Sequence, residues 1–148
     1  MIALTRIETT LATLVGFPTV SSAPTADMAA YIAGRWEASG ARVRIVGDAA
    51  AGKVNLVATL GPDQPKGGIL LSGHMDVVPV DGQDWTRAPF DLSEDEDDRL
   101  YGRGTCDMKG FIAASLVLAE SLKDTPLARH LHLAFTHDEE VGCLGAQA

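Results

Sequence analysis

The chain has 148 residues, 46% of them hydrophobic and 22% charged, which is the composition of about one globular domain and not of a disordered segment. Twelve basic and twenty acidic residues give a net charge of −8, which disfavours nucleic acid and anionic membrane surfaces as partners. The longest uncharged apolar run near a predicted helix, residues 111–119, is far shorter than the ~20 residues of a membrane-spanning helix. Two cysteines are too few for a disulfide scaffold, so we expect a cytoplasmic protein.

Apolar side chains recur every three or four positions in two early segments, which predicts amphipathic helices there. The first helix spans residues 4–14 and ends before Gly16. The second begins at about Thr25 and ends at Gly40. A third helix, over residues 108–122, is apolar almost all the way round, so we expect it to pack against a sheet.

Four segments have the β-branched or alternating pattern of strands: residues 42–46, 53–60, 69–71 and 131–135. The third of these has no polar alternation and is predicted to be buried on both faces. Residues 81–104 are turn-rich, with room for a hairpin at their end, and their acidic stretch 94–98 is interpreted as a solvated loop tip. Helices interleaved with buried strands predict the α/β fold class, as a three-layer α/β/α sandwich.

The first segment with candidate metal-binding or catalytic side chains is residues 72–76 (Ser-Gly-His-Met-Asp). It lies at the end of a predicted strand, where α/β folds bind their ligands. His74 and Asp76 are two residues apart on an extended chain and therefore project to the same side. This arrangement suits an imidazole that binds a metal while a nearby carboxylate orients its other nitrogen. A histidine with a purely structural role is the alternative.

The second segment, residues 102–110, is a glycine-rich turn directly before the apolar helix. It does not fit a dinucleotide-binding loop, because Asp107 stands where glycine is needed and would repel a pyrophosphate. A Walker loop needs Gly-Lys-Ser/Thr, whereas the chain has Lys109-Gly110-Phe111. The segment therefore holds an aspartate in a turn at a helix start, for which a plain N-cap is the simplest role.

The third segment is residues 137–140, which place Glu139 and Glu140 at the end of the last predicted strand. Adjacent carboxylates at a strand end point to opposite sides, so one can bind a metal while the other faces a bound water. Two like charges this close are costly to bury unless a cation is present. An exposed acidic turn is the alternative.

Together the three segments favour a two-metal site. Such a site needs a carboxylate that bridges ions about 3.5–4 Å apart, terminal histidine and acidic ligands, and a base near the bridging water. Other enzyme signatures, such as His-Glu-x-x-His, Gly-x-Ser-x-Gly and Cys-x-x-Cys, are missing. We expect Cys106 and Cys143 to be buried small residues, and His130 and His132 to be packed or solvent-facing side chains rather than ligands.

These motifs resemble those of a known family. Residues 70–79, 100–110 and 136–142 are similar to the three N-terminal motifs of the acetylornithine deacetylase and succinyl-diaminopimelate desuccinylase family of dinuclear zinc hydrolases. Within the family, the motif sequences are most similar to those of acetylornithine deacetylase. The resemblance runs from about the first residue to the last, and it implies an α/β/α sandwich of the zinc-exopeptidase type.

The resemblance also implies a role for each motif residue. His74 would bind one zinc ion, Asp107 would bridge two, and Glu140 would bind the second. Glu139 would be the general base, and Asp76 would support His74. Cobalt is an alternative to zinc, and the peptide bond after Asp107 is expected to be cis.

The activity implied by the resemblance is hydrolysis of the amide bond of an N-acyl amino acid, foremost N2-acetyl-L-ornithine to L-ornithine and acetate in arginine biosynthesis. A zinc-activated water would attack the acyl carbonyl as Glu139 takes its proton. The partner would be this small-molecule substrate, and the complete protein would be a homodimer. A succinyl-diaminopimelate desuccinylase, aminoacylase or dipeptidase of the family, and a non-catalytic metal-binding fragment, are the alternatives.

The implied ligand set is incomplete within the chain. The family site needs a further carboxylate shortly after the glutamate pair and a histidine near the far end, whereas residues 141–148 contain neither type. The family's lid and dimerisation domain has no counterpart either. Because zinc catalysis needs three protein ligands for each ion, we expect residues 1–148 to be the N-terminal part of a catalytic metallohydrolase domain. Alone, this part is expected to be inactive, to bind zinc weakly and to expose unpaired sheet edges.

Overall fold

The computed structural model describes residues 4–21, 23–62 and 66–147 of the chain. In chain order its helices and strands are α1 (Leu4–Val15), α2 (Ala26–Ala38), β1 (Arg42–Asp48), β2 (Lys53–Leu60), β3 (Ile69–His74), β4 (Ser93–Glu94), β5 (Leu100–Tyr101), α3 (Gly110–Ser121) and β6 (Leu131–Thr136). Two short helical turns, η1 (Thr105–Lys109) and η2 (Leu144–Gln147), precede α3 and follow β6. Every helix and strand predicted from the sequence is present, with small shifts of boundary. Within the described ranges, no helix is both long and apolar enough to cross a bilayer.

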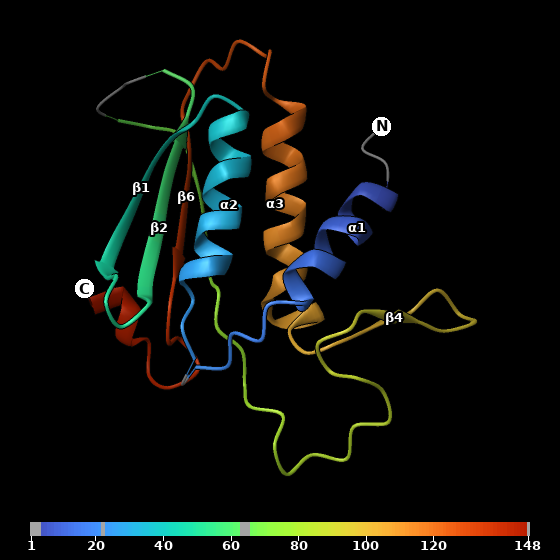
Figure 1. Cartoon of the computed structure of the whole chain (residues 1–148). Helices are drawn as coiled ribbons and strands as arrows, with labels where there is room; N and C mark the ends of the chain where they lie inside the picture. Colours follow the sequence, from blue (N-terminus) through green and yellow to red (C-terminus); the bar gives the residue numbers. More distant parts are fainter. Residues whose placement is uncertain (1–3, 22, 63–65, 148) are drawn as a thin grey trace.

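Four of the strands form one mixed sheet in the order β1-β2-β6-β3 (Figure 1). β2 is antiparallel to both of its neighbours, β1 and β6, whereas β3 runs parallel to β6. A parallel pair needs a crossover connection, and α3 lies in the one that joins β3 to β6. The register pairs His74 with Thr136, so the carboxyl ends of β3 and β6 finish side by side. Two of the sequence motifs are thereby brought to the same edge of the sheet.

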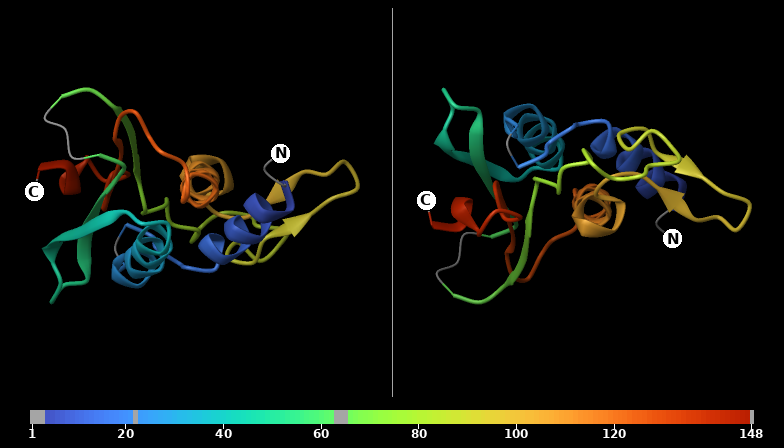
Figure 2. Two further views of the ribbon diagram at one scale, coloured as in Figure 1. Left: turned by 90° about the horizontal axis from the view of Figure 1, so that it is seen from above. Right: turned by 90° about the horizontal axis from the view of Figure 1, so that it is seen from below.

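Helices α2 and α3 pack on one face of the sheet, and α1 packs against α3 (Figure 2). The core lies between these helices and the sheet, where Trp36, Leu56 and Phe135 are fully buried. Buried residues lie on several sides of α3, as predicted from a sequence that is apolar almost all the way round the helix. Among the helices of the described ranges, η2 alone lies against the second face, where Asn55 donates a hydrogen bond to the carbonyl of Gly145. The α/β class is therefore confirmed, with two of the three predicted layers built by the described residues.

β3 is an edge strand, and its first apolar side chains are not buried. Ile69 and Leu70 are 64% and 59% exposed, because β3 is paired with β6 on one side and is the last strand of the sheet on the other. The prediction of burial on both faces was wrong for these two residues. The start of β3 thus has the composition of an interior strand at an edge position.

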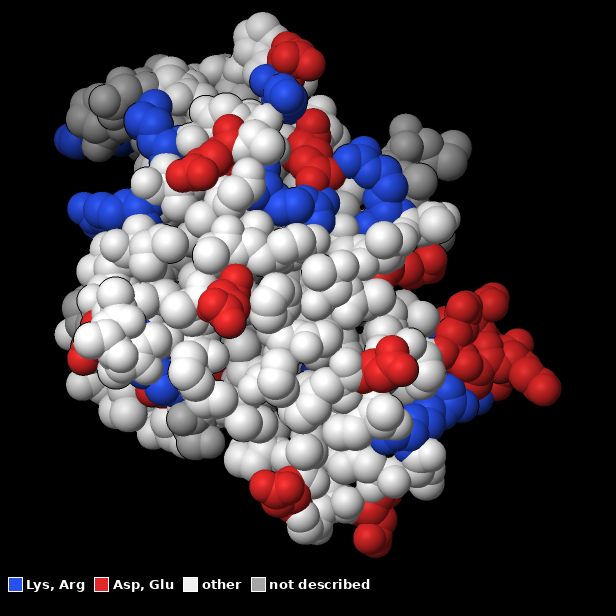
Figure 3. Space-filling model, in the orientation of Figure 1, with Lys and Arg blue, Asp and Glu red and all other residues white. Residues whose placement is uncertain are grey.

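β4 and β5 form a small hairpin that projects from the helical side of the molecule (Figure 1). Its tip consists of residues 94–98, all of them acidic, which form the red cluster on the projecting part of Figure 3. Arg99 forms ion pairs with Asp95 and Asp97 at 2.8 and 2.5 Å. Most of these side chains are exposed, so the predicted solvated tip is confirmed.

Candidate metal centre

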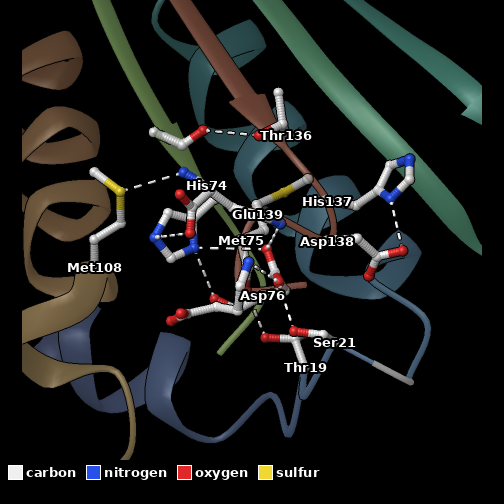
Figure 4. A network of polar contacts seen from close by, with 12 residues as sticks. Thr19, Ser21, His74, Met75, Asp76, Met108, Thr136, His137, Asp138 and Glu139 are labelled. Atoms are coloured by element: carbon white, nitrogen blue, oxygen red, sulfur yellow. Dashed lines mark hydrogen bonds and ion pairs between the residues drawn. The ribbon is translucent and has the colours of Figure 1, made fainter. Parts of the chain in front are cut away.

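His74 ends β3 and is the buried centre of the candidate site. Its Nδ1 atom lies 2.9 Å from the backbone carbonyl oxygen of Asp76 (Figure 4), and its Nε2 atom lies 3.0 Å from Oδ1 of Asp107. In the neutral ring, donation from Nδ1–H to the carbonyl leaves Nε2 as the free ligand nitrogen. His74 therefore has the geometry of a metal ligand whose second nitrogen is held by the chain.

Asp76 is fully buried, and its carboxylate joins several segments. Oδ2 accepts a hydrogen bond from the Ser21 hydroxyl at 2.7 Å, and the two oxygens accept the backbone N–H groups of Glu139 and Glu140 at 3.0 and 3.2 Å. Burial disfavours the ionised carboxylate, yet hydrogen bonds from His74, Ser21 and these amides outweigh it and hold the pKa of Asp76 well below its usual range. Asp76 therefore links His74 to the turn that carries the glutamate pair.

Asp107 lies in η1, a kinked turn in which Asp107 and Met108 have non-helical dihedral angles. The peptide bond between them is cis, which confirms the expectation drawn from the family resemblance. The Asp107 side chain is 72% exposed and directs Oδ1 at His74. The close approach of η1 to β3 depends on Gly73, because a Cβ atom there would lie 2.8 Å from the Met108 sulfur.

Glu139 and Glu140 lie in a turn after β6, which ends at Thr136. The strand alternation inferred from the sequence therefore does not set their directions, and their backbone is held instead by Asp76. Oε2 of Glu139 lies 3.8 Å from Nε2 of His74. One ligand atom from each of His74, Glu139 and Glu140 lies within 4.8 Å of the other two.

The charges of the site fit a divalent cation. Burial lowers the pKa of His74, but hydrogen bonds to Asp76 and then Asp107 outweigh it and raise the pKa to about 9. Burial, followed by the Asp107 charge, raises the pKa of Glu140. The carboxylates around His74, and the contribution of Asp107 to the raised pKa of Glu140, mark negative charge that a bound cation would offset. Two ligand atoms on one tetrahedral zinc ion lie roughly 3.3 Å apart, close to the 3.0 Å between His74 Nε2 and Asp107 Oδ1.

All five site residues predicted from the sequence lie at this edge of the sheet. His74, Glu139 and Glu140 form the close group, and Asp107 joins it through its contact with His74. Asp76 lies behind them and contacts both ends of the group. The division of roles between a ligand Glu140 and a base Glu139 stays a prediction.

The two cysteines are exposed, so the prediction that they are buried was wrong. Cys106 lies in η1, and Cys143 lies in the turn after the glutamate pair, with Sγ 3.6 Å from Oε1 of Glu139. Both are in loops around the site, where a small side chain is not packed into the core. The rings of His130 and His132 pack together at a centroid distance of 4.2 Å, which confirms a packed role for this pair.

Three further residues around the site were not predicted from the sequence. Ser21, between α1 and α2, donates a hydrogen bond to Asp76. Lys53, the first residue of β2, forms an ion pair with Asp138 at 2.6 Å. Asp138 is buried and has φ of 52°, in the left-handed region. A serine among small residues, a lysine at a strand start and one acid within an acidic run follow no periodicity that marks them.

A carboxylate-rich edge with one buried imidazole, on a mixed sheet covered by helices, is the kind of site that metal-dependent hydrolases use. The family described as peptidase family M20/M25/M40 matches residues 70–148, more than half of the chain. The chain belongs to this family of hydrolases.

Individual relatives agree with this assignment. Acetylornithine deacetylases of Pectobacterium carotovorum and Pectobacterium atrosepticum are 46% identical to the chain over 95 residues, which are 64% of this chain and 24% of each relative. The structure of human carnosine dipeptidase 1 matches with a TM-score of 0.80 at 29% identity, over 94% of this chain and 33% of that one. A family M20 metallo-carboxypeptidase from Sulfolobus solfataricus matches with a TM-score of 0.78 at 28% identity, over 95% of this chain and 32% of that one. The chain thus spans about a quarter of the length of the deacetylases and about a third of the solved structures.

Proposed function

We propose that the chain is the N-terminal part of the catalytic domain of a dinuclear zinc amidohydrolase that cleaves the amide bond of an N-acyl amino acid. One observation carries the proposal: an imidazole and carboxylates from three separate segments meet where β3 and β6 end. These residues are His74, Asp107, Glu139 and Glu140. Membership of the M20/M25/M40 peptidase family supports hydrolysis of an amide or peptide bond as the reaction class.

Each residue has a defined role in this proposal. His74, Asp107 and Glu140 would hold the metal ions, with Asp107 as the ligand common to both. When bound, zinc supplies a water of lowered pKa and polarises the acyl carbonyl. Glu139, whose partly exposed carboxylate lies beside His74, would be the general base that accepts a proton from the attacking water and returns it to the departing amine. Asp76 orients the His74 ring and holds the backbone of Glu139.

The favoured substrate is N2-acetyl-L-ornithine, because the Pectobacterium relatives of 46% identity are acetylornithine deacetylases. These relatives extend well beyond the matched segment, since it makes up 24% of their length. We place the two further ligands that the family resemblance implies, a carboxylate and a histidine, in the part of a complete protein that corresponds to this extra length. The homodimer interface is assigned to the same part.

A dipeptidase is the competing function, because the fold of human carnosine dipeptidase 1 is closely similar. Fold likeness alone does not decide between substrates that differ in the acyl group, which depends on residues outside the metal ligands. The experiment must therefore compare substrates directly.

A chimeric enzyme makes that comparison. The chain replaces the matching segment of the Pectobacterium carotovorum deacetylase, and the zinc-loaded protein is assayed with N-acetylornithine, N-succinyl-diaminopimelate and a dipeptide. We expect N-acetylornithine to be hydrolysed fastest, and the same chimera with His74→Ala to lose its activity with its metal. Faster turnover of the dipeptide would assign the chain to a dipeptidase. A folded, zinc-loaded chimera that hydrolyses none of the three would contradict the proposal.

A further inference from the structure

The turn that carries Glu139 and Glu140 lies beyond the paired part of β2 and β6. The pairing of these two strands extends to Leu56 and Phe135 and ends there. Residues 137–140 therefore depend on contacts other than this ladder for their position. Because Glu139 and Glu140 must lie beside His74 in the proposed metal site, those contacts decide the geometry of the site.

Lys53 connects this turn to the segment between α1 and α2. Its Nζ atom donates a hydrogen bond to Oδ1 of Asp138 at 2.6 Å and another to the backbone carbonyl of Ser21. The side chains of Lys53 and Asp138 are 19% and 12% exposed, so the ion pair is largely shielded from solvent. Removal of one partner from such a pair leaves the other charge poorly compensated. The contact therefore restrains Asp138, the residue directly before Glu139.

Ser21 continues the connection to the other side of the same turn. Its hydroxyl donates to Oδ2 of Asp76 at 2.7 Å (Figure 4), and Asp76 in turn accepts the backbone N–H groups of Glu139 and Glu140. The turn is thus held through the Asp138 side chain on one side and through its own backbone amides on the other. Ser21 takes part in both, by its carbonyl and by its hydroxyl.

The segment that carries Ser21 is itself fixed to the first motif. The Thr19 hydroxyl donates to the carbonyl of Met75 at 2.7 Å, and the Val77 N–H donates to the carbonyl of Thr19 at 2.9 Å. The Ser21 N–H donates to the carbonyl of Val77 at 3.2 Å. Ser21 therefore has a defined position relative to the strand end that carries His74.

We propose that Ser21, Lys53 and Asp138 form a positioning clamp that sets the backbone of Glu139 and Glu140 relative to the His74 ring. The inference rests on the proposed function, in which these three residues are neither ligands nor the base. They act through Asp76 and through the turn. Ser21 and Lys53 lie outside residues 70–148, the part that matches the family, so two of the three clamp residues come from the N-terminal segment of this chain.

Amide hydrogen exchange in the metal-free chain measures the clamp without depending on metal binding. We expect Lys53→Met and Ser21→Ala to speed exchange of the Glu139 and Glu140 amides by about tenfold, because local opening becomes easier. The amide of Leu133, in the centre of β6, should be unchanged. Wild-type exchange rates at Glu139 and Glu140 in both variants would overturn the clamp.

Two further variants separate the charge from a general effect on folding. Lys53→Arg keeps the cation and should restore most of the protection, while Lys123→Met, at an exposed lysine, is the matched control and should change nothing. If Leu133 exchange also accelerates in Lys53→Met, that variant has lost its fold, and Ser21→Ala decides. A Lys53→Arg chain that keeps its fold and exchanges as fast as Lys53→Met overturns the role of the cation.

Zinc affinity of the same variants, measured by competition with a chromophoric chelator, is the second readout. We expect Lys53→Met to weaken zinc binding by about tenfold, a typical effect of losing a residue that supports a ligand, and Lys53→Arg to bind nearly as the wild type does. If the wild-type chain alone binds zinc too weakly to measure, the exchange rates decide the clamp, while the chimeric enzyme decides the proposed function. Equal zinc affinity in Lys53→Met and the wild type contradicts the effect of the clamp on the site.

Discussion

The backbone carbonyl oxygen of Asp76, rather than its carboxylate, lies nearest to Nδ1 of His74, at 2.9 Å against 3.5 Å. Asp76 thus orients the imidazole mainly through its main chain, while its side chain mainly binds Ser21 and the turn after β6. The two tasks are separable by mutation, because a change of side chain leaves the carbonyl in place.

The substitution Asp76→Asn is expected to keep the contact to His74 and to weaken the contacts to the turn. The amide offers one acceptor oxygen where the carboxylate offers two, so at least one of its three donors, Ser21 and the amides of Glu139 and Glu140, loses its partner. We expect a loss of about 2–3 kcal/mol in the free energy of unfolding, measured with urea. Asp91→Asn, at an exposed acid, is the control, and an equal effect of the two substitutions would contradict the role of Asp76.

Zinc binding is expected to release a proton from His74. The pKa of His74 in the metal-free chain is about 9, so the ring is charged at neutral pH, while zinc binds the neutral ring. Apparent affinity should therefore rise by about tenfold per pH unit from pH 7 and level off near pH 9. Calorimetry in buffers of different ionisation enthalpy counts the proton. An affinity that does not change with pH over this range contradicts the prediction.

The raised pKa of His74 also affects the stability of the metal-free chain. Since the folded pKa of about 9 exceeds the ordinary value of 6.5, this group stabilises the fold fully below pH 6.5, and the contribution is lost as the pH rises through 9. Unfolding of His74→Gln should lack this dependence. The difference in the free energy of unfolding between the wild type and His74→Gln, measured with urea, is therefore expected to shrink as the pH rises from 6.5 to 9.

Lys109 should make the free energy of unfolding rise with pH, opposite to the effect of His74. Its side chain is fully buried, its Nζ donates one hydrogen bond of 2.6 Å to the carbonyl of Phe17, and burial lowers its pKa from 10.5 to about 8. Above pH 8 the folded chain releases the proton before the unfolded chain does, so the cost of burying the charge disappears by pH 10.5. Relative to Lys109→Met, the free energy of unfolding of the wild type, measured with urea, should rise by up to about 3 kcal/mol between pH 8 and pH 10.5. If this difference in the free energy of unfolding between the wild type and Lys109→Met does not change with pH, the prediction that burial of the Lys109 charge destabilises the fold is wrong.

Glu139→Ala tests the general base in the chimeric enzyme. We expect turnover of N-acetylornithine to fall by at least about 10²-fold, with zinc content unchanged, because the proton acceptor is lost but the proposed ligands are kept. Cys143→Ser is a matched neighbour, since its sulfur lies 3.6 Å from Oε1 of Glu139, and it should retain turnover. Near-normal hydrolysis by Glu139→Ala would remove Glu139 from the role of base.

Glu120 is expected to be the main polar link between the three helices. It lies on α3 and binds Arg6 of α1 and Arg35 of α2. Glu120→Gln should lower the free energy of unfolding by about 1–3 kcal/mol, because two arginines lose their counter-charge. Arg6 is 56% exposed, so Arg6→Gln should cost no more than about 0.5 kcal/mol. Urea unfolding of both variants measures the difference, and equal effects would contradict the prediction.

Periodicity predicted the helices and strands because each of them buries a defined face. The pattern that contains Trp36, for example, marks the side of α2 that lies on the sheet. The motifs predicted the edge where His74 and Glu139 meet, because the carboxyl ends of parallel strands lie together. The exposure of Ile69 was not predictable, since it depends on which strands lie beside β3 and not on the composition of β3 itself.

The surroundings of the site depend on contacts between distant parts of the chain. Lys53 and Asp138 are 85 residues apart in the sequence, and they meet because β2 and β6 are neighbours in the sheet. Their residue types are common at strand starts and in acidic turns, so no local pattern distinguishes them. Cys143 was predicted to be buried from its residue type, whereas its exposure follows from the turn that Asp76 holds in place.

A further strand could pair with the edge of β3 that does not face β6. β6 pairs with β3 along its whole length, from Ile69 to His74, and a strand on the other side would run past the same residues. Such a strand would hide the apolar start of β3 and end level with His74. Its last side chains and the loop after it would then face the carboxylates from across the edge. A segment that seals the apolar surface by pairing with β3 would in the same step form the opposite wall of the metal site.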